Sequence, residues 1–170
     1  MELKDYFLKQ LEQETALNRK VLERVPEGRN DWKPHQKSMA LGYLAALVAA
    51  MPGWIAFMVE DDQLDFESPK ADQFRTRAVD TRVQLLELLE NAYSKAKKAL
   101  EGTDEQHLHT RWRLVSGHRV LSEGERYTMI SDAVFSHLAH HRGQLTVYLR
   151  LNEAAVPALY GPSADEGQFG

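Results

Sequence analysis

The chain has 170 residues, near the size of an ordinary folding unit and enough for one hydrophobic core, so we expect a single domain over residues 1–170. Its formal net charge is −4 with both signs interspersed, which argues against a nucleic-acid partner. Since the chain contains no cysteine, disulfides, a thiolate nucleophile and cysteine-ligated zinc are excluded. Any metal site must therefore use histidine, carboxylate or water.

The N-terminal stretch MELKDYFLKQLEQE is charged from residue 2 and lacks the apolar core of a signal peptide. The chain also has no run of about 18 or more apolar residues, so the sequence predicts no membrane-spanning helix. We therefore expect a cytoplasmic protein that has no membrane partner.

Apolar residues recur every three or four positions through residues 2–25, which predicts an amphipathic helix. Glu14 and Asn18 lie on the same stripe as these apolar residues. Because buried polar side chains need hydrogen-bond partners, the two residues either face a pocket or mark a solvated end of the helix.

Residues 39–60 form a second predicted helix, which is apolar nearly all round. Such a helix must be buried on two sides, so we expect one side in the core and the other in a homodimer interface. Pro52 removes a helical hydrogen bond and Gly53 loosens the chain beside it. These two residues predict a kink.

The rest of the chain supplies two more helices. Residues 61–74 are a polar loop, and residues 75–100 have the apolar spacing of a third helix. The stretch around Ser116-Gly117-His118 predicts a short hairpin or an ordered loop. Residues 127–151 form the fourth helix. The expected fold class is therefore all-α, a four-helix bundle.

Two histidines mark the fourth helix. His137 and His141 are four residues apart, so they point the same way, and both fall within its predicted apolar stripe. Such a pair can converge on one divalent ion, and a metal centre needs at least a third protein ligand. The alternative is a neutral pair hydrogen-bonded to each other, to Gln144 or to water. We expect Gln144, Tyr148 and Asn18 to line the same pocket.

Arg142 lies off the predicted stripe and is interpreted as a surface or tail-binding residue, since arginine is seldom buried unpaired. The alternative is that Arg142 and Gln144 orient a substrate carboxylate or thiol. The tail contains YGPSADE. We expect this segment to pack back on the helices with Tyr160 buried.

Three stretches carry a resemblance to a known family: DWKPHQKSMALGYLAALVAAMPGW, HLAHHRGQLTVYLRLN and VPALYGPSADE. Through them the chain resembles the DinB-like family along nearly its whole length. The resemblance implies an up-down-down-up bundle that usually forms a homodimer. It also implies a divalent-metal site, often for nickel or zinc, made by one histidine of the second helix and two of the fourth. The family and its relatives include thiol-dependent transferases and isomerases.

Carried over to this chain, the fourth-helix ligands fall on His137 and His141, and the second-helix ligand falls on Leu47. Leucine cannot bind a metal. Glu14 is the candidate substitute. The resemblance therefore implies a metal-dependent (thiol-)transferase or hydrolase with a depleted metal site. The alternative is a non-catalytic dimeric bundle that binds a ligand or partner and has lost the metal. No catalytic residue is assigned.

Overall fold

The computed structural model describes residues 2–167. Most of the described chain is helical, with one π-helical segment (η3) and two 3-10 segments (η1 and η2) among the α-helices. In chain order the helical segments are α1 (Leu3–Leu22), α2 (Leu41–Ala50), η1 (Met51–Gly53), α3 (Trp54–Glu60), η2 (Pro69–Gln73), α4 (Arg82–Glu101), α5 (Glu105–Leu108), α6 (Arg126–Met129), η3 (Ile130–Ser136) and α7 (His137–Leu151).

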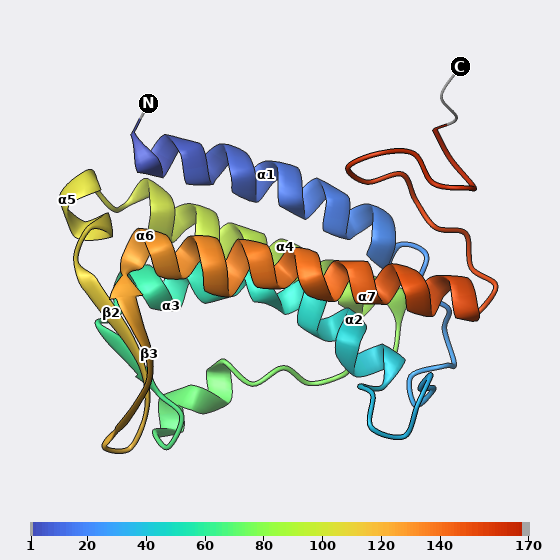
Figure 1. Cartoon of the computed structure of the whole chain (residues 1–170), viewed down its shortest axis with the longest axis horizontal. Helices are drawn as coiled ribbons and strands as arrows, with labels where there is room; N and C mark the ends of the chain where they lie inside the picture. The colour runs from blue at the N-terminus through green and yellow to red at the C-terminus, as the bar shows by residue number, and fades with distance from the viewer. Residues whose placement is uncertain (1, 168–170) are drawn as a thin grey trace.

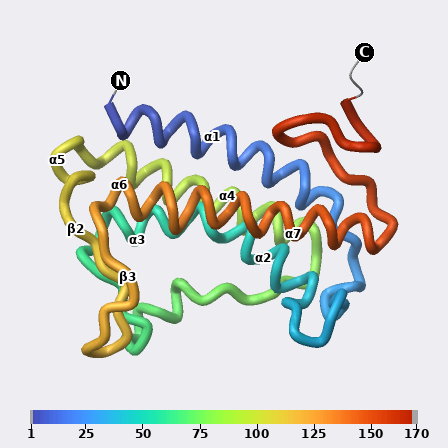
Figure 2. The backbone as a smooth tube through the Cα atoms, in the orientation of Figure 1, coloured from blue at the N-terminus to red at the C-terminus, as the bar shows by residue number. Residues whose placement is uncertain are grey.

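The long helices lie side by side (Figures 1 and 2). α1 and α7 run in one direction, and α4 and the α2–α3 segment run in the opposite direction. α1 packs mainly on α4, whereas α2 packs on α4 and α7. The tail beyond α7 turns back toward the end of α1. Each histidine of α7 is therefore held on a helix that packs against α2.

A three-stranded mixed sheet lies at the other end of the helices, beside α5 and α6 (Figure 1). The prediction of an all-α four-helix bundle is therefore wrong. The hairpin expected around Ser116-Gly117-His118 is present as β2–β3. The strand that sequence analysis missed is β1, which is only three residues long and pairs in parallel with a distant strand, so local periodicity does not reveal it. The strands, in sheet order, are β1 (Gln63–Asp65), β2 (Arg111–Ser116) and β3 (Arg119–Glu125).

Arg126 attaches this sheet to the helices. Its side chain is 1% exposed and donates to the carbonyl oxygens of Met58 and Asp61, at 2.9 and 2.7 Å. It also pairs with the Asp62 carboxylate. A buried guanidinium with these acceptors fixes the end of α3 against the start of α6.

The predicted helix over residues 75–100 begins later, at Arg82. Thr81 accepts a hydrogen bond from the backbone N–H of Gln84, and the Gln84 side chain accepts one from the backbone N–H of Thr81. This capping box fixes the start of α4, so residues 75–81 remain non-helical. The predicted kink near Pro52 and Gly53 is confirmed, because η1 separates α2 from α3.

The stretch Leu41–Glu60 is long and apolar enough to span a membrane by length and composition alone, and 67% of its most apolar window is buried inside the protein. Within α2 every residue from Leu41 to Ala49 except Tyr43 is buried. Because α4 and α7 of the same chain cover this helix, its apolar character no longer requires a subunit interface along α2.

Candidate functional site

The structure brings the two predicted histidines of α7 together. The Nε2 atoms of His137 and His141 lie 2.8 Å apart, and Nδ1 of His141 lies 2.8 Å from Oε1 of Gln144. An amide oxygen only accepts, so His141 donates through Nδ1–H and its Nε2 carries the lone pair. That lone pair points at His137. Nε2 of His141 therefore accepts a hydrogen bond from the Nε2–H group of His137.

Burial keeps His141 neutral. His141 is only 8% exposed, and desolvation lowers its pKa below the ordinary value of 6.5. The hydrogen bond to Gln144 acts in the opposite direction, while the neighbouring His137 and His140 rings lower the pKa further. His141 therefore presents an unprotonated Nε2 at neutral pH.

His137 differs from the prediction because it is exposed rather than buried. The predicted stripe treated residues 127–151 as one regular α-helix, whereas η3 has π geometry and changes the rotation per residue before α7 begins. Counted within α7 from the buried Leu138, His137 lies about 100° around the helix and Arg142 only about 40°. His137 therefore lies just beyond one edge of the buried face, and Arg142 lies within its other edge, on the same side as the buried Leu149.

Arg142 is accordingly buried, at 1% exposure, rather than on the surface. It forms an ion pair with the Glu14 carboxylate and donates to Oδ1 of Asn18 at 2.8 Å. It also donates to the Tyr160 hydroxyl, which in turn donates to Glu14. Contact with the tail was one of the two predicted placements for Arg142. The prediction that Tyr160 is buried is wrong, since its residue is 69% exposed and only the hydroxyl reaches inward.

Glu14 and Asn18 therefore face inward from α1, but they complete a buried cluster with Arg142 and not the histidine pair. Asn18 is fully buried and also donates to the carbonyl oxygen of Val48, at 3.2 Å. Both side chains have their hydrogen bonds satisfied by this cluster.

Two contacts define the relative position of α2 and α7 along their axes. The Tyr148 hydroxyl donates to the carbonyl oxygen of Met39, and the Trp54 ring lies 6.0 Å from the ring of His137. The two helices are antiparallel, so later residues of α2 lie beside earlier residues of α7. Leu47, near the middle of α2, lies between these two contacts and belongs to the same hydrophobic cluster as Leu138 and Leu145. Tyr148 lies away from the histidines, toward the start of α2.

The residues present do not fit a metal centre with three protein ligands. Within residues 2–167, no group of three histidine, aspartate or glutamate side chains lies close enough to hold one ion. Leu47 offers no donor, and Glu14 is already paired with Arg142. The predicted pocket set of Gln144, Tyr148 and Asn18 is likewise divided, because only Gln144 contacts a histidine of the pair.

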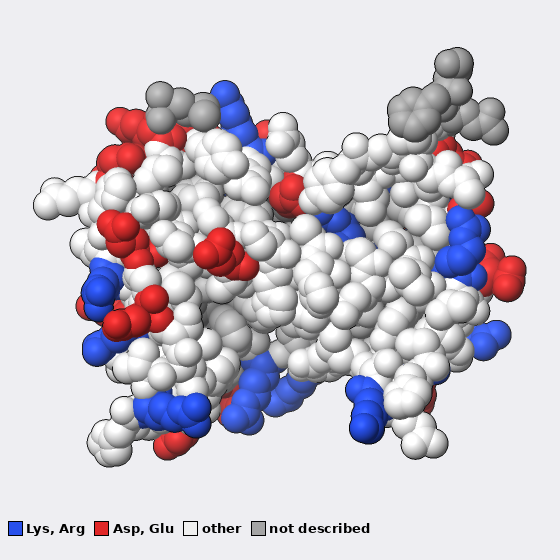
Figure 3. All heavy atoms as spheres, in the orientation of Figure 1, with Lys and Arg blue, Asp and Glu red and all other residues white. Residues whose placement is uncertain are grey.

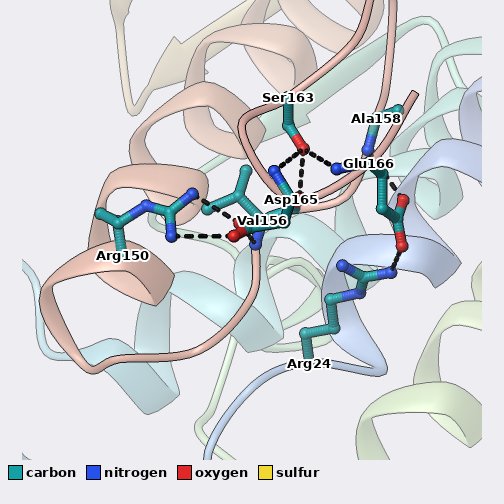
Figure 4. A network of polar contacts seen from close by, with 7 residues as sticks. All are labelled: Arg24, Arg150, Val156, Ala158, Ser163, Asp165 and Glu166. Atoms are coloured by element: carbon teal, nitrogen blue, oxygen red, sulfur yellow. Dashed lines mark hydrogen bonds and ion pairs between the residues drawn. The ribbon is translucent and has the colours of Figure 1, made fainter. Parts of the chain in front are cut away.

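A second polar network fastens the C-terminal tail over this region (Figure 4). Asp165 pairs with Arg150 at the end of α7, and Glu166 pairs with Arg24 just beyond the end of α1. Ser163 accepts hydrogen bonds from the backbone N–H groups of Asp165 and Glu166. These contacts keep Tyr160 beside Glu14 and Arg142, so the tail is one wall of the buried cluster.

Sequence analysis missed this cluster as a unit. The readable signal was the pair of polar residues on the apolar stripe of α1, since buried polar groups require partners. Arg142 was the missing partner. It was not recognised because the predicted stripe left Arg142 on its flank, although within α7 Arg142 is only about 40° from the buried Leu138 and about 20° from the buried Leu149.

Together these observations define a mostly helical protein with a histidine pair on its last helix, a buried arginine cluster beside it and a small sheet at one end. Residues 1–168 match the DinB family. The chain belongs to the DinB family.

Three relatives illustrate the match. The uncharacterized protein YrdA of Bacillus subtilis (strain 168) is 28% identical over 170 residues, covering 98% of this chain and 93% of the relative. The crystal structure of a DinB-like protein from Bacillus subtilis has 18% identity and a TM-score of 0.65, covering 88% of this chain and 94% of the other. The crystal structure of a DinB-like protein from Bacillus cereus has 17% sequence identity and a TM-score of 0.66, covering 91% of this chain and 95% of the other. These structures support the fold alone.

Proposed function

We propose that the protein is a DinB-family member without a resident catalytic metal, acting as a non-catalytic homodimer that binds a small ligand or partner. The proposal rests on the side chains that are available to bind a metal. Two histidine nitrogens converge, the third family position is Leu47, and the substitute carboxylate of Glu14 is committed to Arg142. Two protein ligands are fewer than stable zinc or nickel sites use.

The competing function is a metal-dependent (thiol-)transferase or hydrolase. In that function the ion would lower the pKa of a bound thiol or water, and the protein would have to hold it with at least three ligands. The histidine pair and Gln144 favour this function, whereas Leu47 and the paired Glu14 oppose it.

Metal analysis distinguishes the two functions. Protein purified without an affinity tag, incubated with nickel or zinc and then desalted, is expected to retain well below one equivalent of metal per chain. A histidine pair alone should exchange its ion during desalting. Retention of one equivalent in the wild type, lost in His141→Ala, would overturn the proposal.

The exposed face of α7 is where we expect the homodimer to form. Val147 and Leu151 lie one turn apart on it and are 56% and 54% exposed, and a side chain added at Gly143 would meet nothing within 4 Å. Figure 3 views the molecule from the side on which α7 is in front, and charged side chains lie mostly around its margin. Arg150, the charged residue beside this face, is already paired with Asp165, so the apolar residues are free to form a self-complementary contact.

A stable homodimer would bury on the order of 1,600 Å² in total, so one charge at its centre should disrupt it. We expect light scattering at micromolar concentration to give twice the chain mass for the wild type and the chain mass for Val147→Asp. Val83→Asp, at an exposed apolar residue on α4, is the matched control and should remain dimeric. A monomeric wild type would show that the homodimer prediction is wrong.

A further inference from the structure

A cavity of about 550 Å³ is lined by Trp54, whose ring lies 6.0 Å from that of His137, but no histidine of the pair lines it. It is bounded by α3, by α4 and by the non-helical segment that precedes α4. The segment stands away from the helices because the capping box delays the start of α4 to Arg82. At one border of the cavity Gly53 packs directly on α4, where an added Cβ would lie 3.4 Å from Cα of Ala92, in ordinary van der Waals contact.

One wall of the cavity is aromatic. The rings of Trp54 and Phe74 are stacked with centroids 4.4 Å apart, and Phe57 meets Phe74 edge-on at 5.8 Å. These three residues line the cavity. A stacked aromatic wall is suited to a flat apolar molecule, and the volume is that of an ordinary small-ligand site.

The cavity is also lined by cationic side chains. Arg75, Arg77 and Lys95 line it, with Asp72 as the acidic residue. Arg75 pairs with Asp72 at 3.3 Å, whereas Arg77 and Lys95 form no ion pair within residues 2–167. Two uncompensated positive charges therefore border the aromatic wall.

Thr76 supplies a second polar feature. Its Oγ1 is buried without a hydrogen-bond partner in the described structure, and the residue lines the cavity. A buried hydroxyl without a partner costs free energy, which a ligand oxygen at this position would recover.

We propose that this cavity binds a small aromatic anion, a flat apolar ring system carrying one sulfonate or carboxylate group. The ring system lies against Trp54 and Phe74. The anionic group is held by Arg77 and Lys95, with the Thr76 hydroxyl as a further donor. This site is separate from the histidine pair and does not depend on a metal.

Two fluorescent probes test the proposal: 8-anilinonaphthalene-1-sulfonate, and N-phenyl-1-naphthylamine, which lacks the sulfonate. With EDTA present, we expect the sulfonate probe to saturate one site per chain. In Arg77→Gln/Lys95→Gln its affinity should fall at least about tenfold, or 1.4 kcal/mol, while that of the neutral probe changes little.

Two controls make the result specific. Lys33→Gln/Lys37→Gln removes the same net charge from exposed residues of the connector before α2 and should leave both affinities unchanged. Asn91→Trp places a large side chain at an exposed position lining the cavity and should block both probes without changing the melting temperature.

The proposal is overturned if the Arg77/Lys95 variant binds the sulfonate probe as the wild type does, or if the Lys33/Lys37 variant loses as much affinity. It is also overturned if Asn91→Trp still binds both probes, or if probe binding does not saturate at one site per chain.

Discussion

Glu14→Ala is expected to destabilise the protein by about 3–5 kcal/mol, because it leaves the guanidinium of Arg142 buried without its counter-charge. Arg142 is 1% exposed, and Glu14 is its carboxylate partner. Asn18 and Tyr160 remain as neutral acceptors, but they cannot compensate a full charge. Urea unfolding of both proteins at neutral pH measures the difference.

A matched control is available on the surface. Arg19 and Glu90 form an ion pair whose side chains are 39% and 51% exposed, so Glu90→Ala should change stability by about 1 kcal/mol or less. The double variant Glu14→Leu/Arg142→Met removes both charges and should recover much of the loss. If Glu14→Ala is no more destabilising than Glu90→Ala, the ion pair is not the buried contact described above.

Leu47→His is expected to complete a three-histidine metal site with His137 and His141. The two histidines of α7 already converge, so a third imidazole from residue 47 adds a nitrogen ligand at little further ordering cost. Without metal the new polar side chain should destabilise the fold by about 1–3 kcal/mol, because residue 47 is only 7% exposed. Nickel or zinc should restore the stability by binding the native state.

Thermal melts of the wild type and Leu47→His, with chelator and with nickel or zinc, measure both effects. The double variant Leu47→His/His141→Ala keeps the new histidine but removes one of the existing ligands, so its metal response should be lost. An equal metal response in the wild type and Leu47→His would mean that Leu47 does not face the histidine pair.

The sequence predicted the features that depend on local spacing. Phe7 and Leu11 are buried on the stripe assigned to the first helix, and Glu14 and Asn18 on that stripe do have buried partners. The histidine pair was found because residues four apart share a helix face. Each of these inferences needed only the period of one regular helix.

The features that sequence analysis missed depend on contacts between distant segments, or on geometry that differs from a regular helix. β1 is a strand only through its pairing with β2, as in Gln63 with Arg113. Arg142 contacts the tail, as one of its two predicted placements had it, but its burial was missed because its partner Glu14 lies on a helix distant in the sequence. The start of α4 was misplaced although Thr81 and Gln84 have the spacing of a capping box, a signal that was present and not used.

The contacts of the tail have a consequence for the order of folding. Arg24 pairs with Glu166 across 142 positions of the chain, and Tyr160 bonds Glu14 across 146. Contacts of such high sequence separation carry a large loop-closure cost and form late. During synthesis α1 is made well before α7 and the tail, so Glu14 obtains Arg142 and Tyr160 only after 128 or more further residues have been added. Until then the first helix must keep its polar residues in water, and its final docking belongs to the last step of folding.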